Sequence, residues 1–359
     1  MEGSLPLTCR NLAKVCGKII SMMPALGNTC ICQIMTRHLH MAICCRNYWD
    51  SVIEFNDNIV QELKFWYFHA ESIKFRCVTP FYRKFERIIF SDASGYAGAG
   101  FALENNNVVH FMWDMENRTK SSTWRELKTV SNVLESLYDD LKGKMVKLYT
   151  DNQNVVKIVK KGSMKSELQN ISLHIFHLCL SYNILLEVEW IPRDKNFEAD
   201  FLSKMFDYDD WGISQNIFNL FNKIWGPFTC DTFADNKNKK VSIFFSRFFT
   251  PGTSGVDAFA YDWSTYNNWI VPPVHLISRT ISHMRMCKAR GTLVIPKWKS
   301  AVFWPMIINR FTDNYQSYIK DLREYKNPNI FFQPGSQENS IFAKQPFNSS
   351  VLVLLIEFH

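Results

Sequence analysis

Four acidic residues stand where predicted strands end or on predicted helices, the places where α/β proteins put side chains that carry chemistry. Asp92 follows the apolar run IIFS, and Asp151 follows VKLYT. Glu126 opens a predicted amphipathic helix, and Asp200 lies on a later one. Carboxylates that gather in one place raise one another's pKa values, and divalent cations relieve that repulsion. The pattern therefore predicts a site for Mg²⁺, which prefers hard oxygen ligands.

Such a site could cleave a phosphodiester bond. Two ions ~4 Å apart can activate a water and stabilise the departing 3′ oxygen. Each acid also has a plainer interpretation. Asp92 and Asp151 could be turn formers after strands, Asp200 a solvated helix residue, and Glu126 the third residue of a capping box that begins at Thr123. Only the joint order of the four acids favours the metal site over these separate roles.

The elements that must position the acids form a mixed α/β pattern. Predicted strands cover 87–90, 98–103, 108–113, 145–150 and 184–191. One helix begins at Ser122, with the stripe Leu127, Val130, Leu134 and Leu137, and others cover 154–161, 167–181 (N-cap Ser166) and 197–204. Gly95, Gly98 and Gly100 lack the spacing of a dinucleotide fingerprint, and close packing against a neighbouring strand explains them better.

Four sequence motifs, in this order along the chain, resemble those of a known family: SDASGYAGAGF, STWRELKTV, YTDNQNVV and WIPRDKNFEADFLSK. Together they resemble ribonuclease H type 1, in the form fused to the reverse transcriptases of retroelements. For residues 85–206 the resemblance implies an α/β, ribonuclease H-like mixed five-stranded sheet with flanking helices. It implies two Mg²⁺ ions, with Mn²⁺ as a substitute, held by Asp92, Glu126 and Asp151 and by Asp200 as the fourth ligand.

The implied activity is hydrolysis of the RNA strand of RNA–DNA hybrids, with contacts to 2′-hydroxyls selecting the RNA strand. Asn152 and Gln153 follow the third acid and are candidates for such contacts. Arg193, Lys195 and Asn196 stand in the loop before the last acid and are further substrate-binding candidates. The family often carries a histidine in this loop, and its absence here predicts altered turnover.

The first part of the chain, residues 1–84, is predicted to be helical, with apolar positions at Leu12, Val15, Ile19 and Met22. It looks like the thumb or connection segment between a reverse transcriptase palm and ribonuclease H. That likeness implies a grip on duplex nucleic acid through Arg10, Lys14, Lys18 and Arg37, although a solvated helix face explains each equally well. His38 and His40 lie near Cys44 and Cys45, but satisfied side chains are favoured over a zinc site.

The last part, residues 207–359, is similar to polyproteins of DIRS-like (tyrosine-recombinase) retrotransposons. It also faintly resembles phage-type adenine methyltransferases. Where those enzymes have their catalytic Asn/Asp-Pro-Pro-Tyr motif, this chain has Val271-Pro272-Pro273-Val274. A valine side chain can neither hydrogen-bond to the target amine nor stack on the base. A second α/β, methyltransferase-like domain without methyl transfer is therefore expected, retained for binding nucleic acid. A remnant polar site, or ordinary turns and caps, would account for Asp231, Asp235, Asp257 and Asp262.

Composition is compatible with this reading. The net charge of +7 suits a polyanionic partner, and none of the ten cysteines forms a C-x-x-C pair. No secretory signal is evident and the apolar run VLVLLI is too short to span a bilayer, so an intracellular protein, cytoplasmic or nuclear and not secreted, is expected.

The sequence thus predicts a hydrolase, an endonuclease for RNA–DNA hybrids from the C-terminal part of a DIRS-like retrotransposon polyprotein. The polymerase part of the same polyprotein is an expected partner. Two alternatives remain. One is a catalytically decayed remnant that still binds nucleic acid. The other is a related nuclease or integrase acting on DNA, which would typically lack the glutamate on the first helix.

Overall fold

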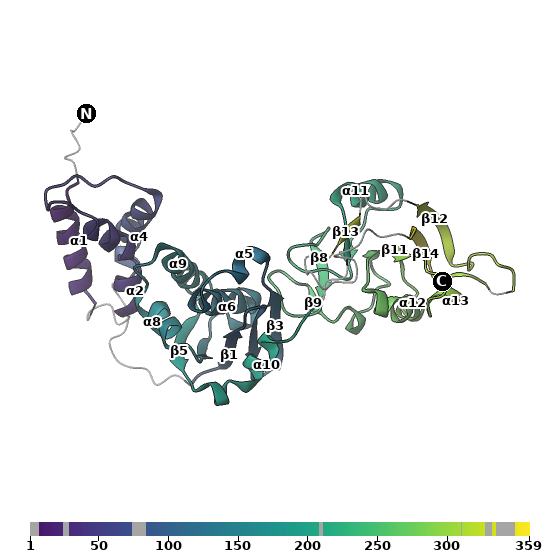
Figure 1. Cartoon of the computed structure of the whole chain (residues 1–359), viewed down its shortest axis with the longest axis horizontal. Coiled ribbons are helices and arrows are strands. Elements are labelled where there is room, and N and C mark those ends of the chain that lie inside the picture. Colours follow the sequence, from purple (N-terminus) through teal and green to yellow (C-terminus); the bar gives the residue numbers. More distant parts are fainter. Residues whose placement is uncertain are drawn as a thin grey trace. The chain divides into compact units, whose positions relative to one another are not determined.

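The computed structural model describes residues 7–23, 29–73, 84–207, 211–309, 311–326, 332–334 and 349–359 (Figure 1). The chain divides into two compact units, Met1–Met205 (unit 1) and Phe206–His359 (unit 2). Unit 1 contains a helical segment followed by a sheet with its own helices. Among the described residues, no helix combines the length and the apolar character that crossing a membrane requires.

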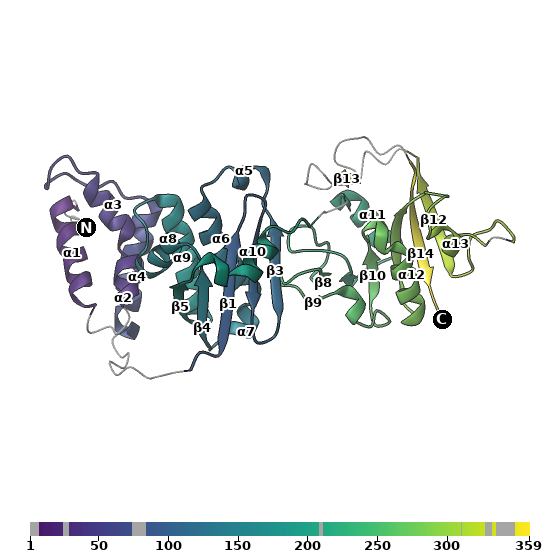
Figure 2. The same cartoon turned by 60° about the horizontal axis from the view of Figure 1, so that its bottom comes forward.

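A five-stranded mixed sheet forms the centre of unit 1 (Figure 2). Its strands are β1 (Arg87–Ala93), β2 (Ala97–Ala102), β3 (Asn107–Met112), β4 (Met145–Thr150) and β5 (Leu185–Trp190). In the order β3-β2-β1-β4-β5, the first three strands are antiparallel, and β4 and β5 run parallel to β1. Since β1 and β4 are parallel neighbours, their carboxyl ends lie at one edge of the sheet. The expected mixed five-stranded α/β architecture is confirmed.

The helices of this part are α5 (Met115–Arg118), α6 (Ser122–Ser136), α7 (Tyr138–Leu141), α8 (Gln153–Lys161), α9 (Ser166–Ser181) and α10 (Phe197–Ser203). Of these, α6, α8 and α10 pack directly on the sheet. The predicted apolar stripe of α6 is fully buried, from Leu127 to Leu137. Helix α10 also packs on β1 and β2, where Ser203 reaches Asp92. Ser91 pairs with Gly100, which faces Val133 of α6, whereas Asp92 faces α10. Because neighbouring residues of a strand point to opposite sides, α6 and α10 lie on opposite faces of the sheet.

Two glycines let α6 approach the sheet closely. A Cβ on Gly100 would collide with the side chain of Val133 on α6. A Cβ on Gly98 would collide with Thr129 of α6 and with Phe111 of β3. The prediction of close packing was right, but the main neighbour is a helix rather than another strand. Gly95 has nothing within 4 Å of such a Cβ, so close packing does not explain it.

Several expected element ends differ from the structure. The N-cap of α6 is Ser121, whose side chain accepts from the Trp124 amide, so the capping box from Thr123 to Glu126 is wrong. Helix α9 starts at Ser166, which is therefore its first residue and not its N-cap. Strand β1 continues to Ala93, which places Asp92 inside the strand rather than after it.

The helical segment consists of α1 (Cys9–Ser21), α2 (Thr29–Ile34), α3 (Arg37–Cys44) and α4 (Asp57–Ile73). Its first helix buries a stripe of Cys9, Leu12, Cys16 and Ile19. Val15 and Met22, expected on that stripe, are exposed. Leu12 and Ile19 lie on the stripe as expected, but Cys9 and Cys16 complete it in place of Val15 and Met22, because cysteine behaves here as a small apolar residue.

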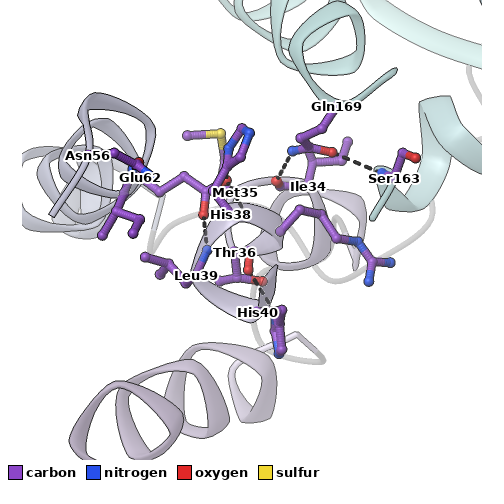
Figure 3. Close-up of polar contacts among 12 residues, drawn as sticks. Ile34, Met35, Thr36, His38, Leu39, His40, Asn56, Glu62, Ser163 and Gln169 are labelled. Atoms are coloured by element: carbon purple, nitrogen blue, oxygen red, sulfur yellow. Dashed lines mark hydrogen bonds and ion pairs between the residues drawn. The ribbon is translucent and has the colours of Figure 1, made fainter. Parts of the chain in front are cut away.

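Two buried polar side chains organise this segment (Figure 3). The Glu62 carboxylate, 1% exposed, accepts from the amides of His38 and Leu39 at the start of α3 and contacts His38 Nδ1 at 3.0 Å. Gln169 of α9, fully buried, donates to the Ile34 carbonyl and accepts from the Ser163 amide. Glu62 therefore fixes α3 on α4, and Gln169 fixes the helical segment on the sheet part of unit 1.

Of the four residues considered for a zinc site, the two histidines have other partners. His38 contacts Glu62, and His40 Nδ1 lies 2.7 Å from the Thr36 carbonyl oxygen. Cys44 and Cys45 are free and exposed.

Unit 2 is built on a seven-stranded sheet in the order β12-β14-β11-β10-β7-β8-β9. The strands are β7 (Cys230–Asp231), β8 (Ile243–Ser246), β9 (Gly255–Val256), β10 (Asn267–Ile270), β11 (Arg290–Pro296), β12 (Ile319–Tyr325) and β14 (Val351–Glu357). Strand β14 is antiparallel to both of its neighbours, while β7 to β11 pair in parallel. The small sheet of β6 (Trp211–Ile213) and β13 (Phe332–Pro334) and the helices α11 (Gln215–Ile224), α12 (Ile277–Met286) and α13 (Trp304–Ile307) complete the unit.

Candidate active site

Asp92 is the last residue but one of β1, and it is 6% exposed. The Ser203 hydroxyl on α10 donates to its Oδ2 at 2.6 Å. Two further bonds tie the same elements together: Asn196 Nδ2 donates to the Ser91 carbonyl at 3.0 Å, and Ser94 Oγ donates to the Ser203 carbonyl at 2.6 Å. The carboxylate of Asp92 is therefore held in one orientation by the helix that carries Asp200.

Glu126 lies in the second turn of α6. Its Oε1 accepts from Asn152 Nδ2 at 3.0 Å, whereas its Oε2 is buried and has no hydrogen-bond partner among the described residues. Burial raises the pKa of Glu126 to about 7, and repulsion from Asp151 and Asp92 adds to the rise, against the hydrogen bond from Asn152. The positive charge of Arg125 also favours the ionised form, but burial and repulsion outweigh it.

Asp151 directly follows β4, at the sheet edge where β1 also ends. Burial and repulsion from Asp92 raise its pKa, and Arg193 opposes the rise. The Asp151 main-chain carbonyl accepts from Trp190 Nε1 at 2.9 Å, which fixes this turn to β5. Asp92, Glu126 and Asp151 therefore form one electrostatically coupled group.

Asp200 lies in the first turn of α10 and differs from the other three acids. Its Oδ1 accepts from Arg193 Nη2 at 2.6 Å, and its Oδ2 accepts from Lys204 Nζ at 2.5 Å. Partial burial would raise the pKa of Asp200, but the bonds from Lys204 and Arg193 outweigh it and lower the pKa. Two cations of the protein therefore already neutralise this carboxylate.

The predicted substrate-binding residues fall into two groups. Gln153, Arg193 and Lys195 are exposed beside the acids. Asn152 is half-buried, caps α8 through the Asn154 and Val155 amides and also holds Glu126, so its side chain is already engaged. Asn196 is 1% exposed and holds its loop on β1.

The four carboxylates do not converge on one point. In the part of the chain that the structure describes, no three side chains of His, Cys, Asp or Glu lie close enough to hold a metal ion. The group nevertheless fits a divalent cation. Among the described residues, Glu126 Oε2 is a buried acceptor without a donor, and burial together with repulsion raises the pKa of both Glu126 and Asp151. Hard carboxylate oxygens are the ligands that Mg²⁺ takes, and a cation would remove that repulsion.

The sequence alone did not identify Ser203 or the link from Asn152 to Glu126. A signal was present, because Ser203 belongs to the word ADFLS and Asn152 to the word TDN. Neither motif indicates which acidic residue the side chain of Ser203 or Asn152 hydrogen-bonds. Ser203 lies 111 residues from Asp92 in sequence, so only the packing of α10 on β1 brings them together.

Removing the Ser203 hydroxyl should weaken cation binding. Groups that orient metal ligands are worth roughly 10- to 100-fold in metal affinity, so we expect Ser203→Ala to weaken Mn²⁺ binding by that factor in calorimetry. Ser136→Ala is the matched control, because its hydroxyl bonds only within α6, to the Asn132 carbonyl. Equal Mn²⁺ affinity in Ser203→Ala and wild type would contradict a positioning role for this hydroxyl.

The raised pKa of Glu126 predicts a pH dependence of stability in metal-free buffer. The unfolded chain releases this proton near pH 4.5 but the folded chain only near 7. The contribution of Glu126 to the free energy of unfolding should therefore be fully present below pH 4.5 and fall by about 3 kcal/mol as the pH rises to 7. Urea unfolding with EDTA measures it, and Glu126→Gln should remove this fall. An unchanged slope in that variant would show that Glu126 is not the titrating group.

In unit 2, three of the four flagged aspartates act in turns. Asp235 accepts from the Lys237 and Asn238 amides, Asp257 caps a short 3₁₀ turn, and Asp262 accepts from the Ser264 amide. Asp231 is different, since it ends β7 and is 3% exposed. Burial raises its pKa to about 7. It lines a pocket in unit 2 together with Trp211, Phe233, Lys240, Trp269 and Val271.

Comparison with known proteins locates a family match in unit 1. Residues 88–206 match the family described as reverse transcriptase-like. That range runs from β1 to the end of the sheet part and holds all four acids. It covers neither the helical segment nor most of unit 2. No curated protein matches the chain.

Solved structures with some similarity include ribonucleases H and a viral reverse transcriptase. LC11-RNase H1, isolated from compost and solved in complex with an RNA/DNA hybrid, is 19% identical, with 33% of this chain and 93% of that chain covered and a TM-score of 0.28. RNase H1 from the halophilic archaeon Halobacterium salinarum is 16% identical (32% and 92% covered, TM-score 0.26). The foamy viral protease-reverse transcriptase in complex with double-stranded DNA is 11% identical (53% and 33% covered, TM-score 0.23).

Proposed function

We propose that unit 1 hydrolyses the RNA strand of RNA–DNA hybrids with two Mg²⁺ ions, as the nuclease part of a DIRS-like retroelement polyprotein. One observation carries the proposal. Parallel pairing of β1 with β4 puts Asp92 and Asp151 at one sheet edge, where both repel the buried carboxylate of Glu126. The match of residues 88–206 to the reverse transcriptase-like family supports it.

Asp92, Glu126 and Asp151 would hold the ions, with Asp200 as a fourth ligand. The bound ions would activate the attacking water and stabilise the leaving 3′ oxygen. Ser203 keeps Asp92 in one orientation, and Asn152 does the same for Glu126. Their hydroxyl and amide donors leave the other carboxylate oxygens available, so less reorganisation is required when a cation binds.

The side chains around the acids would bind the substrate. The Arg193 side chain is 67% exposed although it pairs with Asp200. It can therefore turn to a phosphate when a cation takes over the neutralisation of Asp200. Gln153, exposed beside Asp151, can offer both a donor and an acceptor to a 2′-hydroxyl. Lys195 adds positive charge on the same loop.

The decayed remnant remains the second candidate, and one observation favours it. Arg193 and Lys204 both pair with Asp200, so the fourth acid is neutralised without any cation from solution. A remnant would bind hybrids but not cleave them.

For unit 2 we propose a methyltransferase-like domain that binds nucleic acid without transferring a methyl group. A mostly parallel sheet with one antiparallel strand, β14, between β11 and β12 supports the fold. Val271 follows β10 and lines the pocket beside Asp231. Its side chain offers no hydrogen bond to a target amine, which supports the absence of methyl transfer.

A substrate panel tests the nuclease and separates its rivals. The full chain with Mg²⁺ is given an RNA–DNA hybrid, duplex DNA and duplex RNA, each labelled on either strand. We expect cuts only in the RNA strand of the hybrid, leaving 5′ phosphate and 3′ hydroxyl ends. Cuts in duplex DNA would favour a DNA nuclease, and binding without cuts would favour the remnant.

A further inference from the structure

Helix α8 carries a basic face that starts at the acids. Residues 152–166 contain four lysines and no acidic residue, between Asp151 and Glu167. Gln153, Lys157, Lys160 and Lys161 are exposed, while Val155 is buried. Positions 153, 157 and 160 follow the i, i+4, i+7 spacing of one helix face, so the glutamine and two of the lysines form a stripe directed away from the buried side.

The protein itself does not neutralise this stripe. None of Lys157, Lys160 and Lys161 forms an ion pair with any residue that the structure describes. The acid that follows them, Glu167, pairs with Lys120 at 3.2 Å. By contrast, Lys144, just before β4, pairs with Asp140, and Lys147, within β4, pairs with Glu187. Positive charge without an internal partner suits a polyanion.

Both ends of α8 are anchored. At its start, Asn152 caps the helix and donates to Glu126, so the first turn is fixed to the acids. At its end, Arg37 Nε of the helical segment donates to the Lys161 carbonyl at 2.6 Å. Gly162 follows with a φ of 71°, and a Cβ there would press on Arg37 and Gln169. The stripe therefore keeps a fixed place relative to the carboxylates.

The dimensions suit a nucleic-acid backbone. Between Gln153 and Lys161 a helix rises ~12 Å, whereas successive phosphates of one strand advance ~3.4 Å along a duplex axis. The stripe thus covers the phosphates of a few nucleotides beyond the acids.

We propose that the face of α8 formed by Gln153, Lys157, Lys160 and Lys161 (the α8 lysine face) binds the phosphate backbone of the hybrid beyond the cleavage point. This inference rests on the proposed function for the identity of the duplex. It assigns to this face the affinity for the duplex and to the carboxylates the chemistry. A simpler role exists for two of the lysines, because cations in the last turn of a helix stabilise its dipole. Lys157, in the middle of α8, has no such role.

The test measures binding apart from cleavage. The full chain is titrated into a fluorescently labelled RNA–DNA hybrid in EDTA, and anisotropy is followed at several KCl concentrations. We expect Lys157→Gln/Lys160→Gln to bind roughly tenfold more weakly at physiological salt, with a slope of log K against log[salt] smaller by roughly 1 for each lysine removed. Lys157→Arg/Lys160→Arg should keep both values.

Lys142→Gln is the matched control, an exposed lysine before β4, at the opposite end of that strand from α8. Equal losses in Lys142→Gln and in the double variant would overturn the proposal, as would unchanged affinity and slope in a double variant that unfolds at the wild-type temperature. Lysine-dependent binding by a wild type that cleaves nothing would support the α8 lysine face while refuting the proposed nuclease.

Discussion

Asp151→Asn should reduce cleavage of an RNA–DNA hybrid by about a thousandfold or more. Asp151 directly follows β4, at the sheet edge where β1 also ends, and its charge is needed to offset two divalent cations. A bound cation contributes several kcal/mol of transition-state stabilisation, and each ~1.4 kcal/mol is a factor of ten in rate. Single-turnover cleavage with Mg²⁺ measures the loss.

The same variant should remain folded, which separates chemistry from stability. Repulsion from Asp92 raises the pKa of Asp151, so a neutral amide at this position relieves strain in the metal-free protein. Its thermal unfolding in EDTA should match or exceed that of wild type. Asp194→Asn is the matched control, since Asp194 is exposed in the neighbouring loop. Cleavage by Asp151→Asn within tenfold of the Asp194→Asn rate would contradict the assigned role.

Glu62→Ala should destabilise the helical segment by about 3–5 kcal/mol, because three hydrogen bonds to a buried carboxylate are lost. The substitution leaves the amides of His38 and Leu39 buried without an acceptor. Each unsatisfied group costs about 1–3 kcal/mol. Water has little access to replace the carboxylate, because Glu62 is only 1% exposed.

Thiol labelling can measure how often the helical segment opens, while unit 2 stays folded. Cys9, Cys16 and Cys32 of the helical segment are at most 2% exposed, whereas Cys44 and Cys45 are exposed. The buried thiols should react at least a hundredfold faster in Glu62→Ala than in wild type, since 1.4 kcal/mol is a factor of ten in the opening equilibrium. Glu54→Ala, which removes an exposed acid of the same segment, should react like wild type. Equal labelling rates in both variants would contradict the structural role of Glu62.

The sequence predicted the sheet of unit 1 well because its strands are short apolar runs with clear ends. The predicted strand 145–150 coincides with β4, and the predicted stripe of α6 is buried from Leu127 to Leu137. Both follow from local periodicity, which the chain carries in any context. The order of the four acids along the chain was equally visible, whereas their binding of a cation stays a prediction.

The errors arose where a residue's role depends on distant parts of the chain. The hydroxyl of Ser121 rather than Thr123 caps α6, and local sequence offers both. Val15 is exposed because the helices around α1 bury Cys16 instead. The pairing of Ser203 with Asp92 and of Gln169 with Ile34 joins segments more than 100 residues apart. Tertiary packing decides such contacts, and no single-sequence pattern reports it.

A cleavage time course bears most directly on the central claim that these carboxylates form a metal-dependent nuclease. The full chain is mixed with an RNA–DNA hybrid labelled on the RNA strand, with Mg²⁺ and in parallel with EDTA. We predict fragments of the RNA strand that accumulate with Mg²⁺ and are absent with EDTA, while a labelled DNA strand stays intact. An RNA strand that stays intact with Mg²⁺ at concentrations where the hybrid is bound, or one that is cut equally in EDTA, would contradict the account.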